Sequence, residues 1–158
     1  AARENVLFRL VSDIDEYCEF ARLDANNLLP YWPFLTVTKA IACDDTLVMH
    51  SHLYDKEIGR VALYHSISSY HDAADSLERN FIGRANRWLH YQDMLYFKSQ
   101  GALIYDFGGI AKGSENQKMK HINEFKQGFG GDLVEESNYV SYPIIWWNRI
   151  VRNQSVST

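Results

Sequence analysis

Histidine and carboxylate side chains with helical spacing are the first residues in this sequence whose types could do chemistry. Asn86, His90, Asp93 and Phe97 recur at intervals that place them on one face of a helix. An imidazole titrates near neutral pH, and a carboxylate one turn away can orient it. The spacing therefore predicts His90 as a candidate general base, with a partly exposed His–Asp surface pair as the alternative.

A second carboxylate follows a short apolar run at residues 102–107. Asp106 lies near the end of this run and is followed by Gly108 and Gly109. A carboxylate at the carboxyl end of a sheet strand lies where ligand clefts form in α/β folds, and glycines allow a close backbone approach. Asp106 is thus a second candidate base, and a turn in which it caps neighbouring amides is the alternative.

Three more histidines fall on expected strands. His50 and His52 alternate with one residue between them, so both side chains share one face, and His65 lies on the next strand. Three imidazoles can bind a metal ion. Alternating histidines also occur on half-exposed sheet faces, and no carboxylate ligand is placed beside these three. We therefore expect no metal, and a metal site at these histidines is the weakest alternative.

Charge is unevenly distributed along the chain. The net charge is -4, but residues 79–131 hold eight basic and four acidic side chains, which leaves the remainder acidic. A basic half on an acidic protein favours an anionic ligand there, and ordinary solvated helix faces are the alternative. Gly83 precedes Arg84 and Arg87 at the start of a predicted helix, where amides and cations suit a phosphate.

Hydrophobic patterning predicts the elements that must position these residues. Strands are expected at 5–10, 36–43, 46–54, 60–67, 102–107 and 133–140, and helices from Ser12–Asp13 to Pro30, at 83–100, 115–127 and 143–151. The short connections between the second, third and fourth strands predict an antiparallel meander. The expected class is α/β, with a mixed, mostly antiparallel central sheet flanked by helices in a single domain, 1–158.

Length and composition exclude several classes of protein. The chain has 158 residues, of which 46% are hydrophobic and 23% charged, as in soluble globular domains. Cys18 and Cys43 do not form a disulfide framework or a zinc-finger pattern. No apolar run is long enough to span a bilayer, and the N-terminal residues do not resemble a secretory leader. These features predict a cytoplasmic protein without a membrane span.

Three segments together resemble a known family. They read GRANRWLHYQDM at 83–94, GALIYDFGG at 101–109 and INEFKQGFGG at 122–131. They are similar to the C-terminal part of the FemAB/FemX-like branch of the GNAT acyltransferase superfamily, over about residues 45–140 with the signature region at about 80–140. The resemblance implies a GNAT-like acyl-CoA N-acyltransferase domain whose sheet opens in a V where acyl donor and amine acceptor meet.

The resemblance also implies roles for particular residues. Gly83, Arg84, Ala85 and Asn86 would lie at the pyrophosphate-binding turn before the cofactor helix, and Lys126 would meet an anionic ligand. The expected reaction moves an acyl group from acyl-CoA, possible donors including acetyl-CoA, to an amine on a small molecule or a peptidoglycan-type acceptor. His90 or Asp106 would accept a proton, and Tyr105 or Tyr96 would protonate the leaving thiolate.

The resemblance leaves an alternative of a different class. FemAB-type enzymes usually carry two such domains and a helical arm that engages tRNA, whereas this chain shows one domain and no arm. The alternative is a non-catalytic or half-tandem FemAB-like domain, linked to aminoacyl-tRNA or binding a partner through Trp146 and Trp147. A tRNA partner is not favoured, and the sequence does not set the oligomeric state.

Overall fold

The computed structural model describes residues 5–111, 113 and 115–136 of the chain. The chain divides into two compact units, residues 1–110 and residues 111–158. The first unit contains a five-stranded sheet and the helices that cover it. The second contains one described helix.

The sheet has the strand order β1-β2-β3-β4-β5. Its strands are β1 (Leu7–Val11), β2 (Leu35–Ala42), β3 (Asp45–Asp55), β4 (Arg60–Ser68) and β5 (Ile104–Asp106). The first four pair antiparallel, and β5 is parallel to β4 over only three residue pairs, from Arg60–Ile104 to Ala62–Asp106. The predicted α/β class, the meander and the mixed sheet are confirmed.

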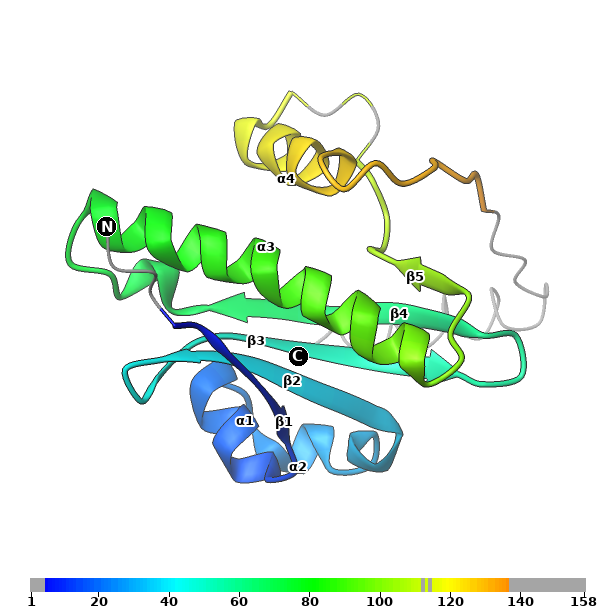
Figure 1. Ribbon diagram of the computed structural model, residues 1–158, viewed down its shortest axis with the longest axis horizontal. Helices are drawn as coiled ribbons and strands as arrows, with labels where there is room; N and C mark the ends of the chain where they lie inside the picture. Colours follow the sequence, from blue (N-terminus) through cyan, green and yellow to red (C-terminus); the bar gives the residue numbers. More distant parts are fainter. Residues whose placement is uncertain (1–4, 112, 114, 137–158) are drawn as a thin grey trace, which may run out of the picture. The chain divides into compact units, whose positions relative to one another are not determined.

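A long helix, α3 (Ser76–Ser99), lies along one face of the sheet (Figure 1). Its buried residues Ile82, Ala85 and Leu89 pack against small or β-branched side chains of β2 and β3, such as Ala40 and Val48. Small residues on the strands let the helix approach closely, so the polar residues farther along the same helix face are also buried.

Two short helices cover the opposite face. They are α1 (Ile14–Ala21) and α2 (Ala25–Leu28), followed by the 3-10 turn η1 (Trp32–Phe34). Tyr17 and Cys18 of α1 pack there with Val37 and Met49. The single helix expected up to Pro30 is wrong, because Arg22 adopts a left-handed conformation, φ 55°, and ends α1 eight residues earlier.

The start of α3 also differs from the expectation. The sequence pattern placed it at Gly83, but the helix begins at Ser76, where Asp75 accepts hydrogen bonds from the amides of Leu77 and Glu78, both 2.8 Å long. A capping carboxylate is a strong start signal. A glycine inside the helix costs only about 1 kcal/mol, which a helix of 24 residues tolerates.

The second unit contains α4 (Gln117–Gln127), capped by Asn116. Asn123 holds the preceding loop through two hydrogen bonds with the backbone of Ala111, at 3.2 and 2.9 Å. Residues 133–136 have no strand structure, and the rest of the strand expected at 133–140 and the helix expected at 143–151, with Trp146 and Trp147, lie outside the described residues.

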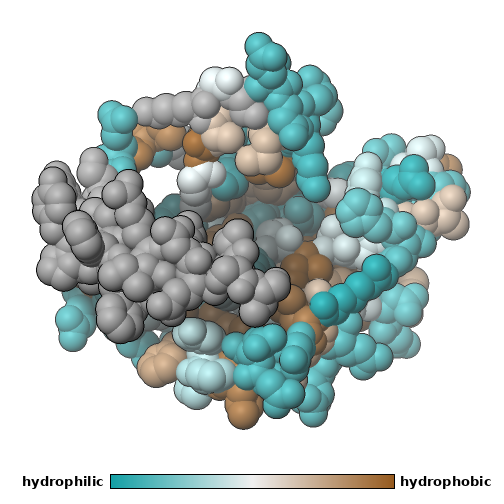
Figure 2. Space-filling view, turned by 180° about the vertical axis from the view of Figure 1, so that it is seen from behind, coloured by the Kyte–Doolittle hydropathy of each residue, from teal (hydrophilic) through white to brown (hydrophobic). Residues whose placement is uncertain are grey.

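The described surface is mixed in polarity. Figure 2 shows polar side chains over much of the described surface that is visible from behind, with apolar side chains between them. Among the described helices, none has both the length and the apolar character needed to cross a membrane.

Candidate functional site

Six polar side chains meet between the sheet and α3, and we call them the buried polar cluster. They come from β3, α3 and β5, and are His50, His52, Asn86, His90, Asp93 and Tyr105. The three histidines and Asp93 are at most 1% exposed. Strand alternation turns His50 and His52 toward α3, and helical spacing turns Asn86, His90 and Asp93 toward β3. The surface-pair alternative for His90 and Asp93 is therefore wrong.

His50 lies between two oxygen atoms. Its Nδ1 is 2.7 Å from Asp93 Oδ2, and its Nε2 is 2.7 Å from Asn86 Oδ1. The His50–Asp93 distance is short for a hydrogen bond to an imidazole, as expected where the partner is a carboxylate. Asp93 is fully buried, so its carboxylate needs a positive partner nearby.

Tyr105 joins two further histidines. Its hydroxyl is 2.9 Å from His52 Nε2 and 3.1 Å from His90 Nδ1. The other ring nitrogen of His52 faces the carbonyl oxygen of Thr36 at 3.4 Å, which assigns the Nδ1–H donor to that side. Tyr105 then donates to His52 and accepts from His90, which gives a continuous chain of three polar groups.

Burial sets the protonation state along this chain. Burial, helped by the charge of Asp93, raises the pKa of the Tyr105 phenol well above its ordinary value. Burial also lowers the pKa of His52 to about 4, although Asp93 acts in the opposite direction. Near neutral pH Tyr105 is therefore a proton-carrying hydroxyl and the His52 ring is neutral.

Two of the three predicted catalytic residues lie together, and the third does not. His90 and Tyr105 are hydrogen-bonded, whereas Asp106 points to the other side of β5 because side chains alternate along a strand. The Asp106 carboxylate accepts from Arg60 at 2.5 Å and from the amide of Gly108 at 2.7 Å. This is the turn-capping alternative considered from the sequence, with an ion pair added.

The residues predicted to hold a pyrophosphate are not in a turn. Gly83, Arg84, Ala85, Asn86 and Arg87 all lie inside α3, where backbone amides bond to carbonyls four residues earlier. Arg84 and Arg87 are exposed, Ala85 is buried in the core and Asn86 faces His50. The turn position expected for these residues was therefore wrong. Lys126 lies on α4, in the second unit.

The turn that does precede α3 carries carboxylates instead of glycine. Asp75 occupies the amides of Leu77 and Glu78, and the Glu78 carboxylate accepts from the amide of Ala74 at 2.7 Å. Asp72, in the same turn, forms an ion pair with Arg22 at the end of α1. An incoming pyrophosphate would meet these negative charges and compete for occupied donors. The residues of this turn therefore do not fit the pyrophosphate of CoA.

Sequence reasoning missed the partner of His50 and His52. It grouped them with His65, but His65 Nδ1 lies 3.1 Å from the Tyr17 hydroxyl of α1. Asp93 takes that place beside His50 and His52, and the ligand-type atoms of these three residues lie within 4.8 Å of one another. The two patterns were visible separately, one on a strand and one on a helix, and only packing brings them together.

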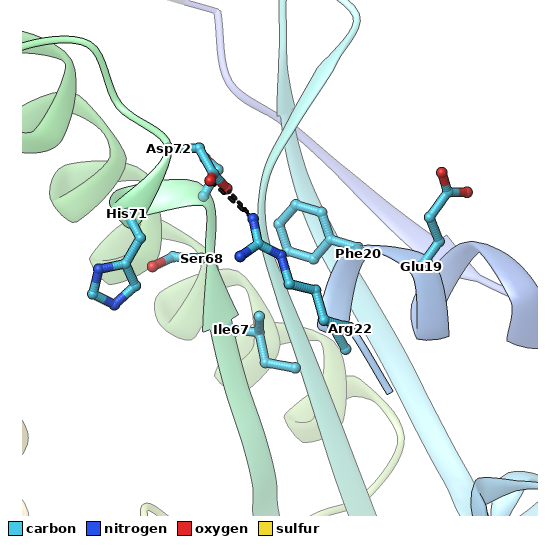
Figure 3. A pocket seen from close by; sticks show the side chains of 9 residues that line it. Glu19, Phe20, Arg22, Ile67, Ser68, His71 and Asp72 are labelled. Carbon is cyan, nitrogen blue, oxygen red and sulfur yellow. Dashed lines mark hydrogen bonds and ion pairs between the residues drawn. The ribbon is translucent and has the colours of Figure 1, made fainter. Parts of the chain in front are cut away.

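A pocket of about 310 Å³ lies elsewhere in the first unit. It is lined by residues from the end of α1 and from the end of β4 with its following turn, among them Glu19, Phe20, Ile67 and His71 (Figure 3). Phe20 and Ile67 belong to the core on the α1 face. The pocket and the buried polar cluster therefore lie on opposite faces of the sheet.

Comparison with known proteins defines the fold. No protein-family model matches the sequence, and no curated protein matches it. An integron cassette protein from the mobile metagenome of V. cholerae is 12% identical, with a TM-score of 0.59 over 87% of this chain and 91% of that one. An aminoglycoside acetyltransferase from an uncultured soil metagenomic sample, in complex with sisomicin, is 8% identical, with a TM-score of 0.61 over 87% and 95%.

A third similar structure was solved with CoA bound. Aminoglycoside N-acetyltransferase AAC(6')-Iy in complex with CoA is 10% identical, with a TM-score of 0.53 over 87% of this chain and 94% of that one. At such identities the likeness shows the fold. The chain has the fold of the GNAT acetyltransferases.

Proposed function

We propose that this protein is an N-acyltransferase that moves an acyl group from an activated donor to the amine of a small molecule. The observation that carries the proposal is the hydrogen-bonded pair of His90 and Tyr105, on a fold that solved acetyltransferases share. Tyr105 lies on β5, which pairs with β4 over three residues only. Beyond Ala62 the rest of β4, to Ser68, has no described strand paired with it on the β5 side.

The chemistry needs one proton acceptor and one proton donor. The amine nitrogen attacks the acyl carbonyl, a C–N bond forms, and the bond from the carbonyl carbon to the leaving sulfur or oxygen breaks. The amine nitrogen loses a proton, and His90, at the end of the hydrogen-bonded chain, is the acceptor. The leaving group takes a proton from the Tyr105 hydroxyl. Because His90 Nδ1 lies 3.1 Å from that hydroxyl, the accepted proton can restore Tyr105.

Donor and acceptor classes belong to the same proposal. Acyl-CoA is the donor that the resemblance implies, and a CoA complex is known for a structural neighbour. The turn before α3 does not fit its pyrophosphate, so no step above depends on the nucleotide. A small-molecule amine is the favoured acceptor, since neighbours include aminoglycoside acetyltransferases. A peptidoglycan-type amine is the alternative acceptor. The proposed location of the protein is the cytoplasm.

The experiment offers acyl thioesters with and without the nucleotide. Acetyl-CoA and acetyl-N-acetylcysteamine, which has no pyrophosphate, are each incubated with the protein and a panel of amines, including an aminoglycoside. Release of free thiol and formation of the amide are measured. We expect amine-dependent turnover, lowered by roughly 10²–10⁴-fold in Tyr105→Phe. Tyr31→Phe, at an exposed tyrosine just before η1, is the matched control that keeps it. Absence of turnover with either donor would refute the proposal.

A second function is favoured by one specific observation, the carboxylates in the turn before α3. A GNAT-fold domain without an acyl-CoA site would be a non-catalytic or half-tandem FemAB-like domain, linked to aminoacyl-tRNA or to a protein partner. The YDFGG and FKQGFGG segments support the FemAB-like branch. Saturable binding of either thioester, followed by transfer to an amine, would exclude this second function.

A further inference from the structure

Two buried oxygen atoms on the α3 face of the sheet have no hydrogen-bond partner among the described residues. They are Asp93 Oδ1 and Thr38 Oγ1. Thr38 pairs directly with His50 across β2 and β3, so its side chain lies on the same sheet face as His50. An unpartnered buried oxygen costs about 1–3 kcal/mol, and more if it is charged. Two of them beside one histidine indicate a missing polar or cationic group.

The histidine nitrogens indicate which kind of group is missing. His50 has an oxygen at 2.7 Å from each ring nitrogen, Asp93 Oδ2 beside Nδ1 and Asn86 Oδ1 beside Nε2. His52 Nδ1 faces the Thr36 carbonyl at 3.4 Å. His50 Nδ1 and His52 Nε2 lie 2.7 and 3.5 Å from Asp93 Oδ2. A proton on His50 Nδ1 would satisfy Asp93 Oδ2 alone. A metal ion held by both rings would also engage the unpartnered Oδ1 and neutralise the buried carboxylate.

We propose that His50, His52 and Asp93 form a binding site for a divalent transition-metal ion of the Zn²⁺ class. Two imidazoles and one carboxylate are a ligand set that Zn²⁺ uses where a fourth position stays open. The three ligand-type atoms lie within 4.8 Å of one another, and all three residues are fully buried. Ligands at about 2.0–2.2 Å from a tetrahedral ion lie roughly 3.4 Å apart, so the side chains would shift by about 1 Å to enclose one.

The surroundings of the three ligands support the assignment. In metal sites, the second nitrogen of a ligating histidine usually donates to a carbonyl or carboxyl-type oxygen, as Asn86 and Thr36 provide here. The Tyr105 hydroxyl lies 2.9 Å from His52 Nε2, and an ion bound to that nitrogen would replace this hydrogen bond. Asn86 and Tyr105, which contact the ligand histidines, are half-buried. The site does not depend on the proposed acyl transfer.

The test uses the full chain after removal of metals with a chelator. Co²⁺ is titrated and its visible absorption recorded, because a site of nitrogen and oxygen ligands with low coordination number gives strong d–d bands. Zn²⁺ then competes. We expect one ion per chain, displacement of Co²⁺ by Zn²⁺, and a rise in Tm of roughly 5–10 °C at Zn²⁺ concentrations near 100 times Kd.

Variants connect the binding to the three residues. His52→Gln and Asp93→Asn should each weaken Zn²⁺ binding at least about tenfold. His65→Gln, on the α1 face, and His121→Gln, on α4, remove an imidazole elsewhere and should leave binding unchanged. If Asp93→Asn does not fold, the His52 variant and the wild-type titration still decide. Absence of saturable binding by the wild type, or equal binding by His52→Gln, would refute the site. A buried water or a proton would then be the partner of the two oxygen atoms.

Discussion

The carboxylate of Asp75 should keep CoA away from the turn before α3. The change that tests this is Asp75→Ser. A serine oxygen can still accept from the amides of Leu77 and Glu78, which now donate to Asp75 at 2.8 Å, so the helix keeps its cap. The variant therefore removes a negative charge while preserving the local structure.

The magnitude follows from the charges and the cap. Two unit charges about 4 Å apart in water interact by about 1 kcal/mol, and a pyrophosphate carries at least two. Removal of the Asp75 charge should thus strengthen CoA binding by about 1–2 kcal/mol, or roughly 5–30-fold. Loss of the cap in Asp75→Ala should lower stability by about 1 kcal/mol, or about 2–4 °C in Tm, and Asp75→Ser should avoid most of that loss.

The assay is a calorimetric titration of CoA into each protein, with Tm measured in parallel. Asp55→Ser is the matched control, because Asp55 accepts from the amides of Glu57 and Ile58 in the turn between β3 and β4 and the charge change is identical. Tight CoA binding by the wild type would refute the reasoning. An equal gain in CoA affinity in Asp75→Ser and Asp55→Ser would show that the effect comes from net charge and not from the position of Asp75.

Three further predictions concern stability and reactivity. Burial raises the pKa of the Cys18 thiol, whereas Cys43 is exposed, so a thiol reagent should modify Cys43 in the native protein and Cys18 only after unfolding; equal rates would contradict the packing of α1. Gly59 has φ 68°, and a Cβ atom added there would lie 3.1 Å from Cγ of Leu103. Gly59→Ala should therefore lower the free energy of unfolding by about 1–2 kcal/mol, measured by urea unfolding. Gly131→Ala, where a Cβ atom has open space, is the control. Burial lowers the pKa of His65, so folding favours the neutral ring and stability should decline as pH falls below about 6.5; His65→Gln should weaken that pH dependence, and an unchanged profile would show that His65 does not contribute.

The local patterns were sufficient for most of the fold. The meander was predicted within one or two residues at each strand, because β-branched residues alternate between short turns expected at 44–45 and 55–59. The face shared by Asn86, His90 and Asp93 was predicted from spacing, since helical periodicity does not depend on what the helix packs against. The start of α3 differs from the prediction because the Asp75 carboxylate caps the helix there, while Gly83 lies inside it.

The candidate site itself was decided by tertiary structure. The sequence by itself determined that His50 and His52 share a strand face and that His90 and Asp93 share a helix face. Which faces meet depends on the packing of α3 across β2 and β3, and no local pattern encodes that distance. Packing joined His50 to Asp93 and Tyr105 to His90, and strand alternation turned Asp106 away toward Arg60. Long-range contacts are therefore the physical reason why the chemistry of this protein was visible only in part from its sequence.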